Sequence, residues 1–503
     1  MNIVEQIFNV DRLTKIGGVV ALKWATGSIT YQELADKIQA AGLELNRHGV
    51  SIGERVVFQC ADTADFVAWY FAVLNIGAVS IAVSTRLGME DLYHVIQDSE
   101  ADALIFDSTT AETCQTINAD SGLIRINLNQ VSLDERISEE LNTVQRKSDQ
   151  EALWVYSSGS TSRPKGIVHT HRCVRDCCEF HTDTLEISVG DLLFCTSKIS
   201  FAYALANGLL APLQLGATVY LHPDWLTPDE LRSIIRVERP RVVFAVPSIY
   251  KGILDLTDIG NDDEFSSVEF YVSAGEYLPA ELQSRWEEFC GRTIVNVYGC
   301  SETLFLALTG NANNTPPDSV GNPLTGVVPN LVDPADAVSV AQGEEGVLHI
   351  EHPFMFTHYA NRPKETEYRL RGARFNTGDL YRQDASGNWY HLGREDDLLK
   401  VAGQWVYLRE IERIGQNSQL AIDVAVIGAR DDVGSIRPAL FFVPSCDSSC
   451  DEAVSLMRKH IERKLPMFKR PKWIRAIDDF PKTANGKLSR SELQRMVEGQ
   501  SRD

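Results

Sequence analysis

The chain has 503 residues, of which 44% are hydrophobic, and it carries a formal net charge of −21 at pH 7. This length exceeds what one hydrophobic core supports, so we expect more than one domain. The acidic balance argues against a nucleic-acid binder and against a protein held on anionic membranes. The ten cysteines contain no C-x-x-C pair, which argues against a zinc site and fits reduced thiols in a cytoplasmic protein.

Helical and strand patterns alternate in the first part of the chain. Apolar residues recur at helical spacing over residues 31–46 and 61–75. Short apolar runs at 55–59, 77–82 and 103–106 predict buried strands. This alternation predicts parallel sheets covered by helices, and therefore an α/β fold. From Glu345 onward the pattern changes to short strands and turns, which predicts a small β unit.

Residues 199–221 form an uncharged segment that is long enough to cross a bilayer. Asn207, Pro212 and Gln214 lower its hydrophobicity. We therefore predict a buried helix followed by a strand, and no membrane span. The first residues lack a basic stretch followed by an apolar core, so we expect no signal peptide.

Residues 156–166, with the sequence YSSGSTSRPKG, are the most informative segment. Small hydroxyl side chains surround Gly159, which lets the backbone approach a ligand closely. Hydroxyls and consecutive backbone N–H groups can bind a phosphate, and Lys165 adds a positive charge. The apolar run at 152–155 predicts a strand that leads into this loop. The candidate phosphate ligands are Ser157, Ser158, Gly159, Ser160, Thr161 and Lys165.

The loop resembles the phosphate loop of the adenylate-forming superfamily, which includes acyl-CoA synthetases, aryl-CoA ligases, peptide-synthetase adenylation domains and luciferases. The family pattern is roughly [ST]-[SG]-G-[ST]-[TE]-G-x-P-K-G, and Ser162 replaces the last loop glycine here. Four further elements follow in the family's order: NVYGCSET at 296–303, NTGD at 376–379, GREDDLLK at 393–400 and PKTANGK at 481–487.

The resemblance implies two domains. Residues 1–395 would form a large N-terminal domain of helix-covered sheets that includes the small β unit. Residues 396–503 would form a small, mobile α+β C-terminal domain. This small domain would rotate about Asp396, because a few hinge residues commonly absorb such motions. Gly403 would then let the backbone pass close to the acyl and pantetheine groups.

The resemblance also assigns roles to residues of the nucleotide site. Tyr298 would lie against adenine, Ser301 would contact the α-phosphate, and Glu302 would hold Mg²⁺. Asp379 would accept both ribose hydroxyls, and Arg394 would reach the ribose or a phosphate. The further expected nucleotide ligands are Gly275, Glu276 and Gly299. The residues expected to stabilise charge during adenylation are Lys487, Thr161, Lys165 and Glu302.

Residues 196–208, TSKISFAYALANG, bear on the acid substrate. Amino-acid adenylation domains usually carry an aspartate after this phenylalanine, whereas this chain has Ala202. An α-ammonium would be buried there without a counter-charge, which disfavours amino acids. The segment resembles the K-x-x-F-A-Y-G-L-G-N element of benzoate-CoA ligases, and SAGEYLP at 273–279 resembles their S-A-G-E-x-L-P element. The expected acid pocket comprises Phe201, Ala202, Tyr203 and Phe305.

Two alternatives stay open for the acid. Phe201 and Tyr203 could be ordinary core residues. A medium-chain or alicyclic acid is the alternative substrate. Phe305 stands where benzoate ligases often have histidine, so the ring substituents are not defined.

The acceptor is the second open point. Tyr407 and Leu408 replace a Ser-Pro pair that is common in aryl-CoA ligases. Lys469, Arg470 and Lys472 could meet the phosphates of coenzyme A or of an acyl carrier protein. We favour coenzyme A, with ATP and Mg²⁺ as the other cofactors, and the carrier protein remains the alternative.

The resemblance thus predicts a ligase that activates an aromatic acid to an acyl-adenylate, transfers the acyl group to a thiol and releases AMP. We expect a monomer or homodimer. A nucleotide-binding regulator without turnover and a luciferase-like oxygenase are the rival classes.

Overall fold

The computed structural model describes most of the chain and divides it into two compact units. Unit 1 comprises Met1–Pro329, Ile350–Phe375 and Gly387–Trp389, and unit 2 comprises Asn330–His349, Asn376–Ser386 and Tyr390–Asp503. The described residues are 2–117, 122–133, 142–157, 163–174, 178–256, 263–312, 314–334, 337–395, 398–401, 404–431, 435–445, 449–481 and 488–498. Among them, no helix combines the length and hydrophobicity that a membrane crossing requires.

A seven-stranded sheet forms one layer of unit 1, in the order β18-β8-β7-β4-β3-β5-β6. Strands β3 to β7 pair in parallel, whereas β8 pairs antiparallel with both β7 and β18. The strands are β3 (Arg55–Gln59), β4 (Val79–Ala82), β5 (Ala103–Phe106), β6 (Ile124–Asn127), β7 (Glu151–Ser157), β8 (Lys165–Thr170) and β18 (His358–Tyr359). The strands expected in this region are confirmed.

Helices cover this sheet and explain its strongly apolar strands. Helix α4 is buried from Phe66 to Asn75, as expected for a helix with apolar residues on every side. It begins at Ala64 rather than at Ala61, because the Thr63 side chain accepts a hydrogen bond from Phe66 N and caps the helix there. The helices of this part are α1 (Ile3–Phe8), α2 (Val10–Ile16), α3 (Tyr31–Arg47), α4 (Ala64–Asn75), α5 (Met89–Asp98) and α6 (Ala111–Thr116).

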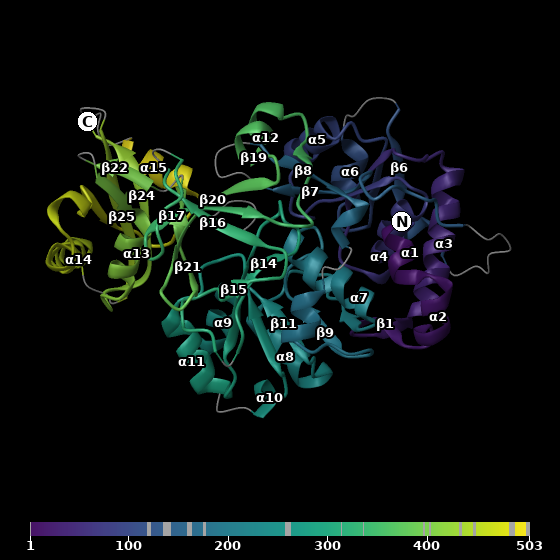
Figure 1. Cartoon of the computed structure of the whole chain (residues 1–503), viewed down its shortest axis with the longest axis horizontal. Helices are drawn as coiled ribbons and strands as arrows, with labels where there is room; N and C mark the ends of the chain where they lie inside the picture. The colour runs from purple at the N-terminus through teal and green to yellow at the C-terminus, as the bar shows by residue number, and fades with distance from the viewer. Residues whose placement is uncertain are drawn as a thin grey trace. The chain divides into compact units, whose positions relative to one another are not determined.

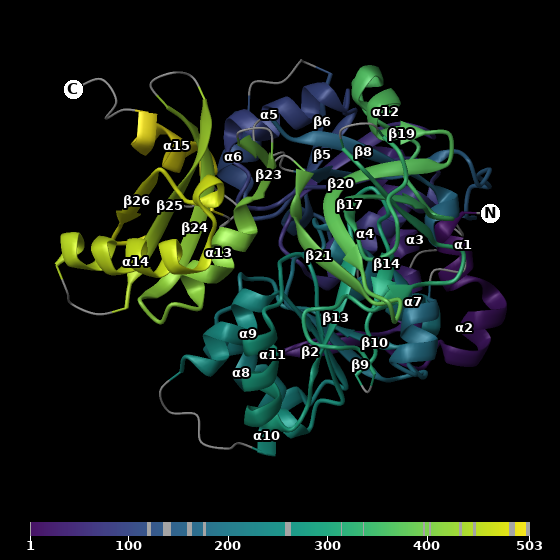
Figure 2. The ribbon, with the colours of Figure 1, turned by 60° about the vertical axis from the view of Figure 1, so that its left-hand side comes forward.

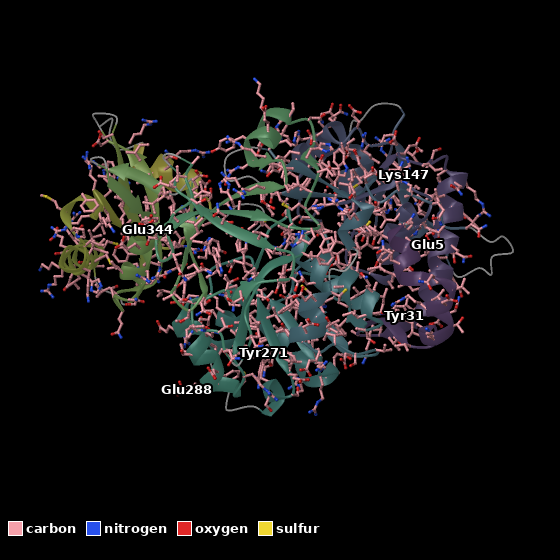
Figure 3. All side chains as sticks on the ribbon, viewed as in Figure 1. Glu5, Tyr31, Lys147, Tyr271, Glu288 and Glu344 are labelled. Atoms are coloured by element: carbon pink, nitrogen blue, oxygen red, sulfur yellow. The ribbon has the colours of Figure 1, made fainter. Side chains whose placement is uncertain are left out.

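A nine-stranded sheet forms the second layer of unit 1, in the order β15-β14-β13-β12-β11-β9-β10-β1-β2. Figure 1 shows α8, α9 and α11 gathered beside β11. They enclose an aromatic core. The centre of the Trp286 ring lies 4.8 Å from that of Tyr250 and 4.9 Å from that of Tyr271. Figure 3 labels Tyr271.

The strands of this sheet are β1 (Val20–Trp24), β2 (Gly27–Thr30), β9 (Leu192–Cys195), β10 (Thr218–Tyr220), β11 (Val242–Ala245), β12 (Phe270–Ser273), β13 (Ile294–Gly299), β14 (Leu306–Thr309) and β15 (Asn322–Pro323). Its helices are α7 (Ala211–Leu215), α8 (Pro228–Glu238), α9 (Pro247–Leu254), α10 (Asp263–Ser266) and α11 (Ala280–Cys290).

Residues 199–221 adopt the expected buried helix followed by a strand, with one difference. The helix begins as the π-helix η4 (Ala204–Leu210) before it continues as α7 and leads into β10. Gly208 of η4 packs on Cys195, and a Cβ at Gly208 would lie 2.6 Å from the Cys195 Cβ. The close approach to β9 requires glycine, and π-turns frequently occur near functional sites.

A third sheet has the order β16-β17-β20-β19, with β21 paired to β20, and its strands carry residues of both units. It confirms the small β unit expected after Glu345, although β16 already begins at Val328. The elements are β16 (Val328–Val332), β17 (Glu345–Glu351), α12 (Pro363–Arg369), β19 (Leu370–Arg371), β20 (Arg374–Gln383) and β21 (Trp389–Arg394).

The end of the chain forms the α+β part of unit 2, which Figure 2 displays. Alternate residues of β24 and β25 point to opposite faces of a three-stranded sheet. One face, with Val426 and Leu440, packs on α13 and α14, and the other, with Ile427 and Phe441, packs on α15. The elements are β22 (Leu398–Val401), β23 (Gln404–Tyr407), α13 (Leu408–Gln416), β24 (Ala421–Arg430), β25 (Ile436–Pro444), α14 (Cys450–Lys464), β26 (Trp473–Ala476) and α15 (Arg490–Glu498). The division at residues 395 and 396 stays a prediction.

Candidate active site

Some residues of the predicted site lie outside the described residues. These are Ser158, Gly159, Ser160, Thr161, Asp396, Gly403 and Lys487. The other predicted site residues are placed, most of them in unit 1 and two, Asp379 and Arg394, in unit 2.

The phosphate-loop segment joins two paired strands. Ser157, the last residue of β7, lies opposite Lys165, the first residue of β8. The strand expected before the loop is therefore confirmed. A Cβ at Gly166 would lie 3.0 Å from the Trp154 ring and 3.2 Å from Ala360, so glycine allows the close packing behind Lys165.

Lys165 lies between two carboxylates. Its Nζ is 2.8 Å from Glu365 Oε1 and 3.8 Å from Glu302 Oε1. The ammonium also lies 4.0 Å from the centre of the Tyr359 ring, which is a cation–π distance. The sequence motifs do not reveal Glu365, because it is 200 residues away from Lys165 along the chain and belongs to none of the motif elements.

Two hydrogen bonds hold Glu302, which lies in the segment that follows β13. Its Oε1 accepts a hydrogen bond of 2.7 Å from the Tyr359 hydroxyl, and its carbonyl accepts one of 2.8 Å from Phe356 N. Burial, together with the neighbouring Glu302 charge, raises the pKa of Tyr359, so this hydroxyl remains a donor at neutral pH. The carboxylate has a defined position beside Lys165.

Ser301 is fixed through its backbone by a buried histidine. His169 Nε2 lies 2.8 Å from the Ser301 carbonyl oxygen. Because a carbonyl only accepts, we assign the ring proton to Nε2. Burial lowers the pKa of His169 to about 4, so the ring is neutral at pH 7. His169 thereby connects strand β8 to the segment that follows β13.

The Glu302 carboxylate suits Mg²⁺ that is bound together with a nucleotide. In the described part of the chain, no group of three or more His, Cys, Asp or Glu side chains could hold a metal ion. Mg²⁺ is commonly bound by one or two carboxylates together with substrate phosphates and water. The Glu302 side chain is partly buried, with 13% of its surface exposed. Its donor set therefore fits a magnesium–nucleotide complex.

The predicted acid-pocket residues make different contacts. The Tyr203 hydroxyl donates to the Val272 carbonyl over 3.3 Å, and this hydrogen bond connects Tyr203 to strand β12. Ala202 and Phe305 are buried in one hydrophobic cluster. Phe201 instead lies with its ring 6.2 Å from Trp225, a neighbour that the motif analysis did not identify. The structure thus anchors this segment to two separate parts of unit 1.

The remaining predicted residues of unit 1 lie at or shortly after the carboxyl ends of β12 and β13. Gly275 follows β12 and has a φ of +83°, which favours glycine. Glu276 Oε2 accepts a hydrogen bond of 3.3 Å from Ser248 N. Tyr298 and Gly299 end β13, and a Cβ at Gly299 would lie 3.0 Å from the Phe305 carbonyl oxygen. Ligand sites in α/β sheets typically occur at such carboxyl ends of strands.

In unit 2, Asp379 and Arg394 form an ion pair of 2.7 Å. The Asp379 carboxylate is buried, and His391 Nε2 lies 3.6 Å from it. Arg409 Nη1 donates to His391 Nδ1 over 2.9 Å, so the ring proton is assigned to Nε2 and faces Asp379. Burial lowers the pKa of His391. The motifs contain Asp379 and Arg394 but not Arg409, which lies outside every motif element.

The basic residues near the end of the chain have partners within unit 2. Lys469 Nζ lies 2.5 Å from Glu410 Oε2, and Lys472 Nζ lies 3.5 Å from Asp431 Oδ2. Arg470 donates to the carbonyls of Leu465 and Glu462 at the end of α14. Their expected contact with phosphates of the acceptor stays a prediction.

Two family models match this chain. The AMP-binding enzyme model matches residues 11–360, and the AMP-binding enzyme C-terminal domain model matches residues 410–487. The chain belongs to the AMP-binding enzyme family. The expected fold class, a large helix-covered α/β part followed by a small α+β part, is confirmed.

Curated relatives of this family match nearly the whole chain. A 3-hydroxybenzoate–CoA ligase of Aromatoleum sp. (strain CIB) is 32% identical over 99% of this chain and 97% of the relative. A benzoate–CoA ligase of Thauera aromatica is 30% identical over 98% of this chain and 95% of the relative.

Solved structures of CoA ligases also match nearly the whole chain. The anthranilate CoA ligase AuaEII in complex with anthranoyl-AMP is 27% identical, has a TM-score of 0.89 and covers 99% of this chain and 97% of its own. A benzoate CoA ligase from Burkholderia xenovorans LB400 is also 27% identical, has a TM-score of 0.88 and covers 98% of this chain and all of its own.

Proposed function

We propose that this AMP-binding enzyme is an acid–thiol ligase that acts on an aromatic carboxylic acid. It activates benzoate or a substituted benzoate with ATP to an acyl-adenylate, and then transfers the acyl group to coenzyme A with release of AMP. One observation carries this proposal: the hydroxybenzoate and benzoate ligases match 98–99% of the chain at 30–32% identity. Ala202 supports it, because no carboxylate stands there to receive an α-ammonium.

In the first half-reaction, a carboxylate oxygen of the acid attacks the α-phosphorus of ATP. The bond between the α-phosphorus and the bridging oxygen breaks, and pyrophosphate leaves. Catalysis in such a step depends on positioning and charge neutralisation. We assign Lys165, Thr161 and Lys487 to stabilising the developing charge. Bound Mg²⁺ would supply further neutralisation of the phosphates, and Glu302 would be its ligand from the protein.

The proposed nucleotide ligands come from several of the sequence motifs. We assign adenine to Tyr298, the ribose hydroxyls to Asp379, and the ribose or a phosphate to Arg394. The other proposed nucleotide ligands are Ser157, Ser158, Gly159, Ser160, Gly275, Glu276, Gly299 and Ser301. The ion pair between Asp379 and Arg394 supports this assignment, because it holds the carboxylate in a defined orientation.

In the second half-reaction, the sulfur of the thiol attacks the acyl carbonyl carbon, the thiol proton passes to solvent, and AMP leaves. The C-terminal domain, residues 396–503, would rotate about Asp396 between the two steps. Lys487 would move away from the acyl group, and the Gly403 segment would approach it. The acid itself would occupy a pocket formed by Phe201, Ala202, Tyr203 and Phe305.

The test is pyrophosphate release across benzoates, hydroxybenzoates, aminobenzoates and aliphatic acids, with ATP and Mg²⁺ and with or without coenzyme A. Products are identified by mass spectrometry. We expect an aryl-CoA. An adenylate without thioester would favour a carrier protein as the acceptor. The carrier protein is the second candidate because Tyr407 and Leu408 replace the Ser-Pro pair that is common in aryl-CoA ligases. Turnover of aliphatic or alicyclic acids alone would contradict the aromatic pocket.

The division of labour between the domains has its own test. Lys487→Ala should suppress adenylate formation by roughly 10²–10³, and it should spare thioester formation from a supplied acyl-adenylate. Replacing Gly403 with tryptophan should have the opposite effect. Lys459→Ala, at an exposed position of α14, is the matched control and should leave both steps unchanged. Equal loss of both steps in Lys487→Ala would contradict the proposed split.

A further inference from the structure

Glu365 is the nearer of the two carboxylates beside Lys165. The ammonium lies 2.8 Å from Glu365 Oε1, which is a charge-assisted hydrogen bond, and 3.8 Å from Glu302 Oε1, which is a longer ion pair. Lys165 is only 17% exposed and has the Tyr359 ring beside it. One cation is thus shared unequally between two carboxylates.

The fold fixes Glu365 in this position. Strand β18 pairs with β8, with Tyr359 opposite Ile167, and Ala360 N donates to the Gly166 carbonyl next to Lys165. Helix α12 follows β18 and places Glu365 in its first turn. Tyr359 N also donates to the Thr366 side chain, so helix and strand are joined by hydrogen bonds. Glu365 is therefore held beside the first residue of β8.

The position of the lysine matters for Glu302. Glu302 Oε1 already accepts from the Tyr359 hydroxyl, and a close Lys165 ammonium would occupy the same oxygen. A metal ion and an ammonium compete for one carboxylate because both need its negative charge. A second carboxylate that draws the Lys165 ammonium away from Glu302 leaves the Glu302 carboxylate accessible to a metal ion.

We propose that Glu365 is a positioning residue that draws Lys165 away from Glu302 and so keeps the Glu302 carboxylate available to the metal of bound nucleotide. The inference rests on the proposed role of Glu302 as the Mg²⁺ ligand. Glu365 itself contacts neither the metal nor the reacting atoms. Without it, Lys165 closes onto Glu302, and the metal loses its ligand from the protein.

The test measures how much Mg²⁺ strengthens nucleotide binding, rather than activity. Isothermal titration calorimetry gives the Kd of α,β-methylene-ATP with Mg²⁺ and with EDTA, and the ratio of the two values is the metal dependence. Glu365→Gln should reduce this ratio about tenfold, the scale of one charge-assisted hydrogen bond. Glu367→Gln makes the same change at an exposed position of the same helix and should leave the ratio unchanged.

The double variant Lys165→Met, Glu365→Gln identifies the competitor. If Lys165 blocks Glu302 when Glu365 is lost, removal of the lysine should restore the metal dependence. Glu365→Asp, which keeps the charge with a shorter reach, should give an intermediate ratio. An unchanged ratio in Glu365→Gln, or no recovery in the double variant, would overturn the inference.

The same measurement separates this inference from the proposed function. Glu302→Gln should reduce the metal dependence at least as strongly as Glu365→Gln. A wild-type ratio in Glu302→Gln would remove Glu302 as the metal ligand, and with it the premise. A reduced ratio in Glu302→Gln with a wild-type ratio in Glu365→Gln would leave the proposed function intact and refute the role of Glu365 alone.

Discussion

Acidification should destabilise unit 1 because three of its buried histidines resist protonation. The Nε2 atoms of His169, His181 and His352 lie 2.8, 3.2 and 3.1 Å from backbone carbonyl oxygens, so each ring is a neutral donor. Burial lowers the pKa of each to about 4, from an ordinary value of 6.5. The unfolded chain therefore binds protons between pH 6.5 and 4 that the folded chain does not.

The sign and size of this acid destabilisation follow from proton linkage. The stabilisation is complete above pH 6.5 and is lost as the pH falls toward 4. Each histidine lowers the free energy of unfolding at pH 5 by about 2 kcal/mol relative to pH 7, which gives about 6 kcal/mol for the three. Asp62 acts in the opposite direction, since burial raises its pKa to about 6 and its protonation returns about 1 kcal/mol at pH 5. The net loss from these four groups is about 5 kcal/mol, and His171, whose pKa burial also lowers to about 4, adds to it in the same direction. A loss of this size is a large share of a typical domain's stability.

The assay is urea unfolding followed by tryptophan fluorescence at pH 7 and pH 5. His169→Gln keeps an amide donor for the Ser301 carbonyl but cannot be protonated. The loss of unfolding free energy between the two pH values should be about 2 kcal/mol smaller in His169→Gln than in the wild type. His48→Gln, at an exposed position, should match the wild type. Equal losses in His169→Gln and the wild type would refute the reasoning.

Two further variants test the packing of the acid-pocket region. Gly208→Ala should lower the melting temperature through a cost of about 1–3 kcal/mol, because the new Cβ would lie 2.6 Å from the Cys195 Cβ. Gly18→Ala, where nothing lies within 4 Å, is its control, and equal melting temperatures would contradict the packing argument. Tyr203→Phe removes the hydrogen bond to the Val272 carbonyl and should cost about 1 kcal/mol. Steady-state kinetics should show a raised KM for the acid and an unchanged KM for ATP, and the reverse pattern would place Tyr203 outside the acid pocket.

The sequence by itself determined the local elements and the family. Helical spacing in residues 31–46 predicts α3, and the apolar runs at 55–59 and 103–106 match β3 and β5 to the residue, because burial on both faces of a parallel strand leaves a continuous apolar run. The ordered motifs likewise identified the family, since each motif is a short stretch of chain whose residues are read together.

Only the tertiary structure decided which residues meet. Glu365 lies 200 residues from Lys165, and no periodicity links a helix turn to a strand so far away. Hydrophobic spacing encodes neither the π-helix at 204–210 nor the close approach of Gly208 to Cys195. The side-chain partners of the predicted site residues are fixed by strand pairing and packing between distant segments. A one-dimensional pattern carries information about neighbours along the chain, whereas electrostatic pairing depends on neighbours in space.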